Sequence, residues 1–302
     1  MRSALVPALL ALALTGCSSA SDARPPADAS STAPAPRAVD FGVQDTIDWC
    51  SLLDPEPLRS LGAFQAPAAV GFEHCLSATG DGAWVRVGAP ESTADDYPGA
   101  LVDREPDGSA VTTVDGGDGE CVKQVSFPGG GVVEVTARSA QGTPLCAAVN
   151  AQVGAVRAAV AAGGPRHVEV AGPTVRTADP CAAAPAEVVR STKALASAEP
   201  LRLPLSHTCR WRPAYGGRGG LTVTVTLTHE TAAAGEGRQE ITLDGKPLAV
   251  DQSPVGCVAV VPVRPAQDGQ EVVSVTALAP NGADKCPLSG SIARAAAARL
   301  AG

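Results

Sequence analysis

Hydrophobic and polar positions alternate most regularly between residues 221 and 228. Apolar side chains and threonines take turns there: Leu221, Thr222, Val223, Thr224, Val225, Thr226, Leu227 and Thr228. Successive side chains of a strand point to opposite faces, so this alternation predicts a strand with one buried face. The repeated pattern Val-Val-x-Val-Thr-Ala, at 132–137 and again at 272–277, predicts two more strands.

Helical spacing appears in other segments. Val149, Val153, Val156 and Val160 share one side of a helix that Thr143-Pro144 is expected to cap. Earlier in the second half, Asp179-Pro180 predicts a helix start, because aspartate is a favoured N-cap and proline fits the first turn. A main helix is expected to open at Pro185. The apolar residues assigned to it, and their counterparts in the first half, are Val188, Val189 and Leu195, and Leu52, Leu53, Leu58 and Leu61.

The N-terminus has the features of an export signal. Arg2 precedes an apolar run from Leu5 to Leu14 that is too short to span a bilayer, which takes about 20 residues. The run ends in Leu14-Thr15-Gly16-Cys17, which resembles the lipobox of bacterial lipoproteins. That resemblance implies a signal peptide over residues 1–16 and a lipid on Cys17. The alternative is that Cys17 is an ordinary leader residue and the product is secreted freely.

Residues 17–40 contain mostly serine, alanine, proline, aspartate and arginine. Such a stretch buries too little apolar surface to offset the entropy of ordering it. We therefore expect a disordered tether between the membrane and the folded part.

The remaining cysteines indicate a duplication. They fall into two sets of four, spaced 25, 46 and 25 residues apart and then 28, 48 and 29 apart: Cys50, Cys75, Cys121 and Cys146, then Cys181, Cys209, Cys257 and Cys286. In each set the last cysteine follows the alanine of the Val-Val-x-Val-Thr-Ala pattern by nine residues. His74-Cys75 is placed opposite His207-Thr208-Cys209. The sequence thus predicts two homologous domains, 41–165 and 174–302.

Each domain is predicted to be α+β, with an antiparallel sheet and N-terminal and C-terminal helices packed on one face. Outside the cytoplasm, four cysteines in about 120 residues are typical of two disulfides, for which three pairings are possible. The short spacings favour Cys50–Cys75 with Cys121–Cys146, and Cys181–Cys209 with Cys257–Cys286.

The second unit resembles a known family. Its Asp179-Pro180-Cys181 opening, its Cys209-Arg210-Trp211 strand and its late cysteine before an alanine-rich helix are similar to actinobacterial lipoproteins built on a domain of unknown function. The first unit departs from the pattern, with Trp49 in place of the proline and Leu76-Ser77 where the tryptophan is expected. The resemblance implies an envelope lipoprotein and assigns no site residues.

Composition narrows the possible functions. Aromatic residues are 3% of the chain, so its core depends on small aliphatic side chains and on disulfides. A formal net charge of −8 gives no attraction to phosphate, so we expect no nucleic-acid partner.

No pattern in the chain predicts catalysis. The four histidines, His74, His167, His207 and His229, lack paired Cys-x-x-Cys spacing, so we expect no metal site and no cofactor. Glu91 with Asp95-Asp96 reads as a solvated acidic loop. The glycine clusters at 116–119 and 216–220 read as turns. Trp84 and Trp211 are expected to be core residues.

These observations favour a non-catalytic binding module, lipid-anchored on the extracytoplasmic face of the membrane through Cys17. Its partner would be an envelope protein or a small ligand, held best by an apolar groove between the two units. Two alternatives remain open: an envelope hydrolase, active or degenerate, and a structural accessory subunit of a membrane complex.

Intact mass of the native protein with non-reducing peptide mapping tests this scheme. We expect an acylated Cys17 and four disulfides in two sets. Free thiols with bound zinc, or an intact leader, would contradict it and would make metal chemistry at His74 and His207 the leading hypothesis.

Overall fold

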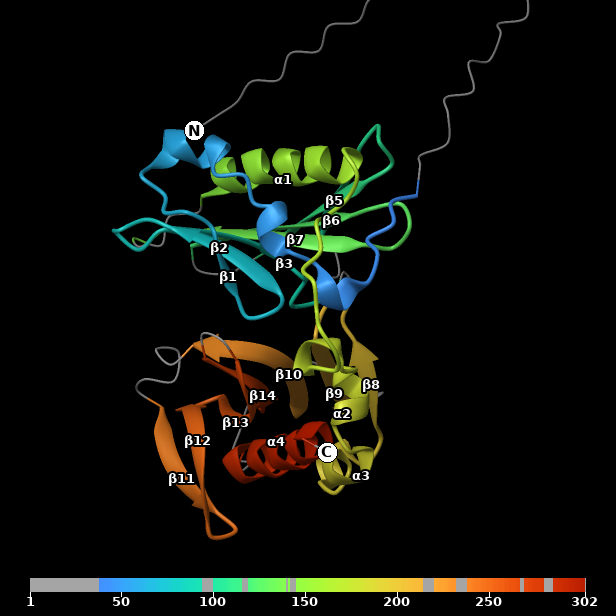
Figure 1. The fold of residues 1–302 in the computed structure, drawn as a ribbon, viewed down its shortest axis with the longest axis vertical. Coiled ribbons are helices and arrows are strands. Elements are labelled where there is room, and N and C mark those ends of the chain that lie inside the picture. Colours follow the sequence, from blue (N-terminus) through green and yellow to red (C-terminus); the bar gives the residue numbers. More distant parts are fainter. Residues whose placement is uncertain are drawn as a thin grey trace, which may run out of the picture. The chain divides into compact units, whose positions relative to one another are not determined.

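Two antiparallel sheets of seven strands dominate the part of the chain that the computed structural model describes (Figure 1). The described residues are 38–93, 100–115, 119–139, 141, 145–213, 220–231, 238–266, 269–279 and 285–301. Below, the N-terminal half means residues 38–165, the C-terminal half means residues 174–301, and residues 166–173 join them.

The first sheet belongs to the N-terminal half. Its strands, in spatial order, are β1 (Ala68–Val70), β2 (His74–Ala78), β3 (Trp84–Gly88), β7 (Val132–Arg138), β6 (Glu120–Ser126), β5 (Ala110–Asp115) and β4 (Leu101–Arg104).

The second sheet belongs to the C-terminal half. Its strands, in spatial order, are β8 (Ala198–Arg202), β9 (Thr208–Pro213), β10 (Thr222–Thr231), β14 (Gly269–Leu278), β13 (Gly256–Ala266), β12 (Lys246–Ser253) and β11 (Gln239–Leu243).

The two sheets have the same strand order. Each has three strands in sequence, then the seventh, sixth, fifth and fourth. Cys121 pairs with Ala137 across β6 and β7, and Cys257 pairs with Ala277 across β13 and β14, so the registers match as well. This shared topology and register agree with the duplication predicted from the cysteines.

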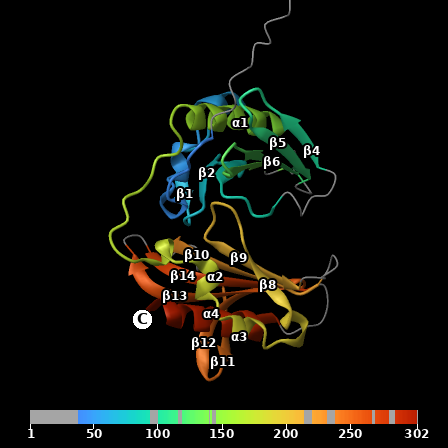
Figure 2. The same cartoon turned by 90° about the vertical axis from the view of Figure 1, so that its right-hand side faces the viewer.

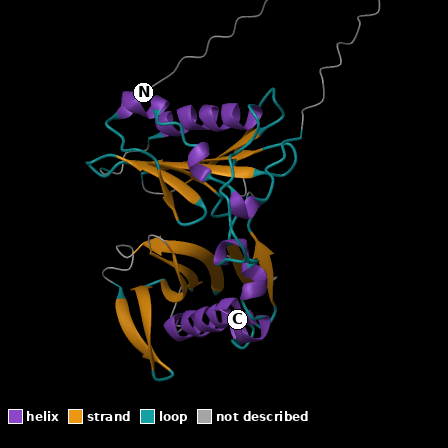
Figure 3. Cartoon of the chain, in the orientation of Figure 1, coloured by secondary structure: helices purple, strands orange, loops and turns teal. Residues whose placement is uncertain are grey.

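One long helix packs on each sheet (Figures 2 and 3). α1 (Cys146–Ala161) contacts β6 and β7, and α4 (Lys285–Ala301) contacts the equivalent strands β13 and β14. The predicted valine stripe is confirmed, because the buried face of α1 includes Val149, Val153, Val156 and Val160. The predicted alternation at 221–228 is confirmed too, with Val223, Val225 and Leu227 fully buried on β10.

The main helix predicted from Pro185 to Leu195 is wrong. The chain forms α2 (Pro180–Ala183), α3 (Ala186–Val189) and a separate 3₁₀ turn Lys193–Leu195. The Ser191 hydroxyl donates to the Val188 carbonyl at 2.7 Å, and such side-chain bonds compete with helix propagation. The predicted N-cap is confirmed, because the Asp179 carboxylate accepts from the backbone N–H of Cys181 at 2.8 Å.

The equivalent region of the N-terminal half is also broken. It forms only 3₁₀ turns, at Gln44–Thr46, Trp49–Ser51 and Glu56–Leu61. Pro55 and Pro57 supply no backbone N–H, which prevents a continuous helix there. Leu52, Leu53 and Leu58 are nevertheless buried in the core, as their apolar character requires.

Two hairpins were not predicted. β4 pairs with β5, and β11 pairs with β12 through Asp244 and Gly245. Both turn residues have positive φ, 49° and 73°, which is the conformation of a type I′ turn. An Asp-Gly pair between alternating apolar residues is the sequence signal for such a hairpin.

Four disulfides join described residues: Cys50–Cys75, Cys121–Cys146, Cys181–Cys209 and Cys257–Cys286. These are the pairs that the short spacings favoured. Each half contains two, and each bond links a strand to a helix or a 3₁₀ turn.

Several predictions concern residues outside the described part of the chain. These are the signal peptide, the lipid on Cys17, most of the tether, the Thr143-Pro144 cap and the Asp95-Asp96 pair. Where the predicted tether becomes visible, the Val39 N–H already donates to the Pro128 carbonyl at 2.7 Å, so the fold begins before residue 41. No helix among the described residues is long and apolar enough to cross a membrane.

Removing one disulfide tests how far these small cores depend on covalent links. The double variant Cys257→Ala/Cys286→Ala opens a loop whose ends are 29 residues apart. The chain-entropy estimate predicts a loss of about 3–4 kcal/mol in unfolding free energy, measured by urea denaturation. The exposed double variant Asp103→Ala/Lys246→Ala is the matched control, with little expected change. A loss below about 1 kcal/mol for the cysteine pair would contradict this dependence.

Candidate functional site

Two equivalent turns bring the halves into contact. The β1–β2 turn holds Gly71, Phe72 and Glu73, and the β8–β9 turn holds Leu205 and His207. Counted back from Cys75 and Cys209, Gly71 matches Leu205 and Glu73 matches His207. The match extends to the backbone, because Gly71 and Leu205 both have positive φ, 61° and 52°.

Each turn gives an apolar side chain to the other half. Phe72 packs in the core of the C-terminal half, and Leu205 packs in the core of the N-terminal half. Burial of a phenylalanine or leucine side chain contributes roughly 1.5–3 kcal/mol. This gain outweighs the strain of a left-handed leucine, which is of order 1–2 kcal/mol.

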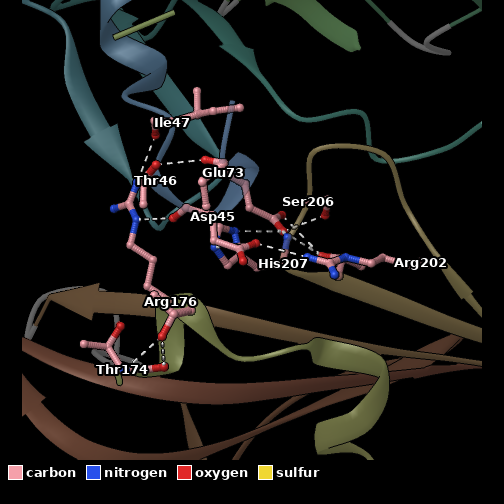
Figure 4. A network of polar contacts seen from close by, with 12 residues as sticks. Asp45, Thr46, Ile47, Glu73, Thr174, Arg176, Arg202, Ser206 and His207 are labelled. Carbon is pink, nitrogen blue, oxygen red and sulfur yellow. Dashed lines mark hydrogen bonds and ion pairs between the residues drawn. The ribbon is translucent and has the colours of Figure 1, made fainter. Parts of the chain in front are cut away.

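Glu73 is the polar centre of this contact (Figure 4). Its buried Oε1 accepts hydrogen bonds from Ser206 Oγ at 2.6 Å, from Thr208 Oγ1 at 3.0 Å and from the backbone N–H of His207. Burial raises the pKa of this carboxyl, and the hydrogen bonds from Ser206, Thr208 and His207 partly oppose that rise. Because three donors of the C-terminal half converge on it, Glu73 links the two halves.

The His207 ring lies beside Glu73 with 1% of its side chain exposed. Neither ring nitrogen has a hydrogen-bond partner. Nδ1 is 4.0 Å from Glu73 Oε1, Nε2 is 4.0 Å from Asp45 Oδ1, and the Phe72 ring centroid is 5.2 Å away. Burial, reinforced by the positive charge of Arg176, lowers the pKa of His207 to about 4, so the imidazole is neutral at pH 7.

The predicted equivalence of His74 and His207 is wrong by one position. Aligned on Cys75 and Cys209, His74 matches Thr208 and His207 matches Glu73. The register agrees, because His74 pairs with Gly88 on β3 and Thr208 pairs with Thr226 on β10. Since side chains alternate along a strand, the two histidines play different parts.

A second pair of equivalent residues meets at the same contact. Asp45 and Arg176 each lie five residues before the first cysteine of their half. Arg176 donates to the carbonyls of Asp45 at 2.7 Å and Ile47 at 2.9 Å, and Arg202 donates to Asp45 Oδ1 at 3.0 Å. Burial raises the pKa of Asp45, and Arg202 opposes that rise.

A cavity of about 660 Å³ opens beside this contact, and both halves line it. Its lining from the N-terminal half includes Ala69, Val70, Gly71, Glu73, His74, Arg86, Pro90 and Glu91. Its lining from the C-terminal half includes Leu203, Thr208, Arg210, Thr224, Thr226, Thr228, His229, Glu230, Thr231 and Thr276. We call this cavity the groove. Thirteen of its eighteen described lining residues are polar or charged, while polar and apolar atoms contribute about equally to its surface, so it is more polar than the apolar groove that would best support a binding module.

Arg86 is the central charge in the part of the groove lining that the N-terminal half contributes. Its guanidinium lies 2.5 Å from Glu91 Oε1 and 3.5 Å from Glu134 Oε1. His74, at the start of β2, has its Nε2 3.2 Å from the Ala89 carbonyl. Burial, together with the charge of Arg86, lowers the pKa of His74 to about 3. The half-buried imidazole that lines the groove is therefore neutral at pH 7.

The other residues singled out from the sequence are dispersed. Trp211 is buried in the core, whereas Trp84 is half-buried with the Arg86 guanidinium 5.8 Å from its ring. His167 lies in the joining segment, with Nδ1 2.8 Å from Thr46 Oγ1. The structure brings only His74, His229 and Glu91 into the groove.

Metal chemistry finds no support among the residues that the structure describes. They contain no group of three or more histidine, cysteine, aspartate or glutamate side chains arranged to hold an ion. The eight cysteines of the two sets are all in disulfides.

Sequence reasoning missed Glu73, Arg86 and Arg210. The first of these had a signal, because counting back from Cys75 and Cys209 pairs Glu73 with His207. The two arginines had no such sequence signal, because each occupies an ordinary polar position of a half-buried strand.

Comparisons of the chain with protein-family models, with curated proteins and with solved structures find no match.

The buried imidazole predicts acid sensitivity. As pH falls from about 6.5 to about 4, unfolded His207 takes up a proton that the folded protein excludes, so stability falls by up to about 1.4 kcal/mol per pH unit. His207→Met removes this effect and places an uncharged side chain at the same buried position. In urea titrations the variant is expected to lose less stability than the wild type over this range.

Two features keep that comparison specific. Above pH 7 the imidazole is neutral in both states, so the wild type and His207→Met are expected to show the same pH dependence there. The raised pKa of Glu73 acts in the opposite direction and is present in both proteins. Equal losses between pH 6.5 and 4 would contradict the assignment to His207.

Proposed function

We propose that the chain is a non-catalytic binding protein of the cell envelope, anchored by a lipid on Cys17, that holds its ligand in the groove. The observation that carries this proposal is the 660 Å³ cavity, whose size falls within the range of about 300–1,000 Å³ typical of ligand sites. Both halves line it, so the duplicated fold itself creates the site.

The rest of the proposal extends the sequence reasoning. The two halves are two homologous domains, each with two disulfides and with its helices on one face of its sheet. Four disulfides suit an oxidising compartment outside the cytoplasm, which is where the lipobox resemblance would place the chain. The tether would hold the groove away from the bilayer.

An envelope hydrolase is the second candidate, and one observation favours it. Glu73 and His74 both line the groove with shifted pKa values, as catalytic groups often do. The hydrogen bonds argue for binding instead. Glu73 is occupied by three donors that join the halves, and the nearest hydroxyl, Ser206 Oγ, is itself buried.

A structural accessory subunit would use the same surface to hold a neighbouring protein.

Site-directed photocrosslinking in intact cells tests the groove. We expect p-benzoylphenylalanine at Thr224, inside the groove, to give a discrete adduct on irradiation. The same residue at Glu240, an exposed position on β11, is the matched control and is expected to give none. No adduct at Thr224, or equal labelling at both positions, would contradict the proposal. Turnover of a peptidoglycan fragment or ester that Glu73→Gln abolishes would support the hydrolase.

A further inference from the structure

Two arginines, one from each half, converge on a single residue in the groove. Arg86 of β3 forms an ion pair with the Glu91 carboxylate at 2.5 Å, and Arg210 of β9 donates to the Glu91 carbonyl oxygen. Both arginines line the groove. One acidic residue therefore occupies the place where cations of both halves meet.

Buried residues of the same half hold the Arg86 guanidinium in position. Its guanidinium is 3.5 Å from the buried carboxylate of Glu134, which in turn accepts from Gln124 Nε2 at 3.0 Å. The Gln124 amide also donates to the Ser92 carbonyl at 3.1 Å. A guanidinium fixed in this way loses little conformational entropy when it binds an anion, and its planar fork suits a carboxylate.

Glu91 is an easily displaced occupant. Its side chain is 58% exposed, and exposed ion pairs contribute little stability because water and salt screen them. A carboxylate from another molecule can therefore replace the Glu91 carboxylate on Arg86 at small cost. The other acidic residues of the wall keep their own partners, since Glu73 accepts from the C-terminal half and Glu230 forms two contacts with Arg238, at 2.5 and 2.8 Å.

We propose that the groove binds a carboxylate-bearing peptide in an extended conformation, with its carboxylate replacing the Glu91 carboxylate on Arg86. This deepens the proposed function and rests on it. The threonines of β10 that line the groove, Thr224, Thr226 and Thr228, repeat every second residue. That is the side-chain repeat of an extended chain, about 6.6–6.8 Å, and each hydroxyl both donates and accepts.

The opposite wall also suits a peptide. Ala69 and Val70 belong to β1, the edge strand of the first sheet, and its residues are exposed. An edge strand offers backbone groups to an added chain. Among the described residues, the groove lining contains no tryptophan, tyrosine or phenylalanine, the side chains on which sugar rings usually stack. The exposed edge strand and the side chains of the groove lining therefore favour a peptide ligand over a glycan or a nucleotide.

Calorimetric titration of the full chain tests this inference with two probes. One is acetyl-Ala-Val-Ala-Val-Glu with a free C-terminus, and the other is the corresponding Gln peptide amide. We expect the acidic peptide to bind at least about tenfold more tightly, the ratio typical of a charge-assisted contact. Arg86→Gln is expected to remove this preference, and Glu91→Gln to raise the affinity for the acidic peptide several-fold.

Three comparisons make the result decisive. Arg104→Gln removes the same charge from β4, at the far edge of the first sheet, and is expected to leave binding unchanged. Arg86→Lys keeps a charge beside Glu134 but loses the planar fork, so it is expected to weaken the preference for the acidic peptide, and it serves if Arg86→Gln fails to fold. Succinate supplies the carboxylate without the peptide, so equally tight succinate binding would overturn the peptide assignment.

Equal binding of the two peptides, no binding of either, or no effect of Arg86→Gln would overturn the inference. The proposed function is judged separately by the Thr224 photocrosslink, which requires no knowledge of the ligand. A Thr224 adduct without carboxylate preference would leave the groove as a binding site and remove only this assignment of its ligand.

Discussion

The exchange of side chains between two equivalent turns is the interaction on which the site depends. Phe72 lies in the core of the C-terminal half and Leu205 in the core of the N-terminal half, while Glu73 accepts three hydrogen bonds across the same contact. Neither half alone would have a place for these side chains. Because the groove is lined by residues on both sides of this contact, its geometry follows from it.

Contact between equivalent segments is what a two-fold dimer makes at its axis, where each residue meets its own copy. Two identical chains would there bring like charges together. In a single chain two equivalent segments can differ, and here they differ in a complementary way. Asp45 matches Arg176, and Glu73 matches His207. The Arg176 guanidinium donates to the Asp45 main-chain carbonyl, and the Glu73 carboxylate accepts from the His207 main-chain N–H. The contact can thus be symmetric in backbone while a donor of one half meets an acceptor of the other.

Much of the fold could be predicted from the sequence, because it is encoded in local patterns. The alternation on β10, the valine stripe of α1 and the cysteine spacing each depend on residues close together or on a simple repeat. The main helix failed because propensity beyond Val189 was weak and Ser191 ended it. Most residues of the candidate site could not be predicted from the sequence. Its members come from both halves, and positions such as Arg86 and Arg210 look like any polar residue of a half-buried strand.

Two of the disulfides lie beside the contact between the halves. Cys75 follows Glu73 by two residues and Cys209 follows His207 by two, so each bonded cysteine lies on the strand that carries the contact. Their partners, Cys50 and Cys181, follow Asp45 and Arg176 by five residues. Each of these bonds therefore ties the two contacting segments of one half together. The segments that carry the Asp45–Arg176 and Glu73–His207 contacts are therefore held by covalent bonds as well as by packing.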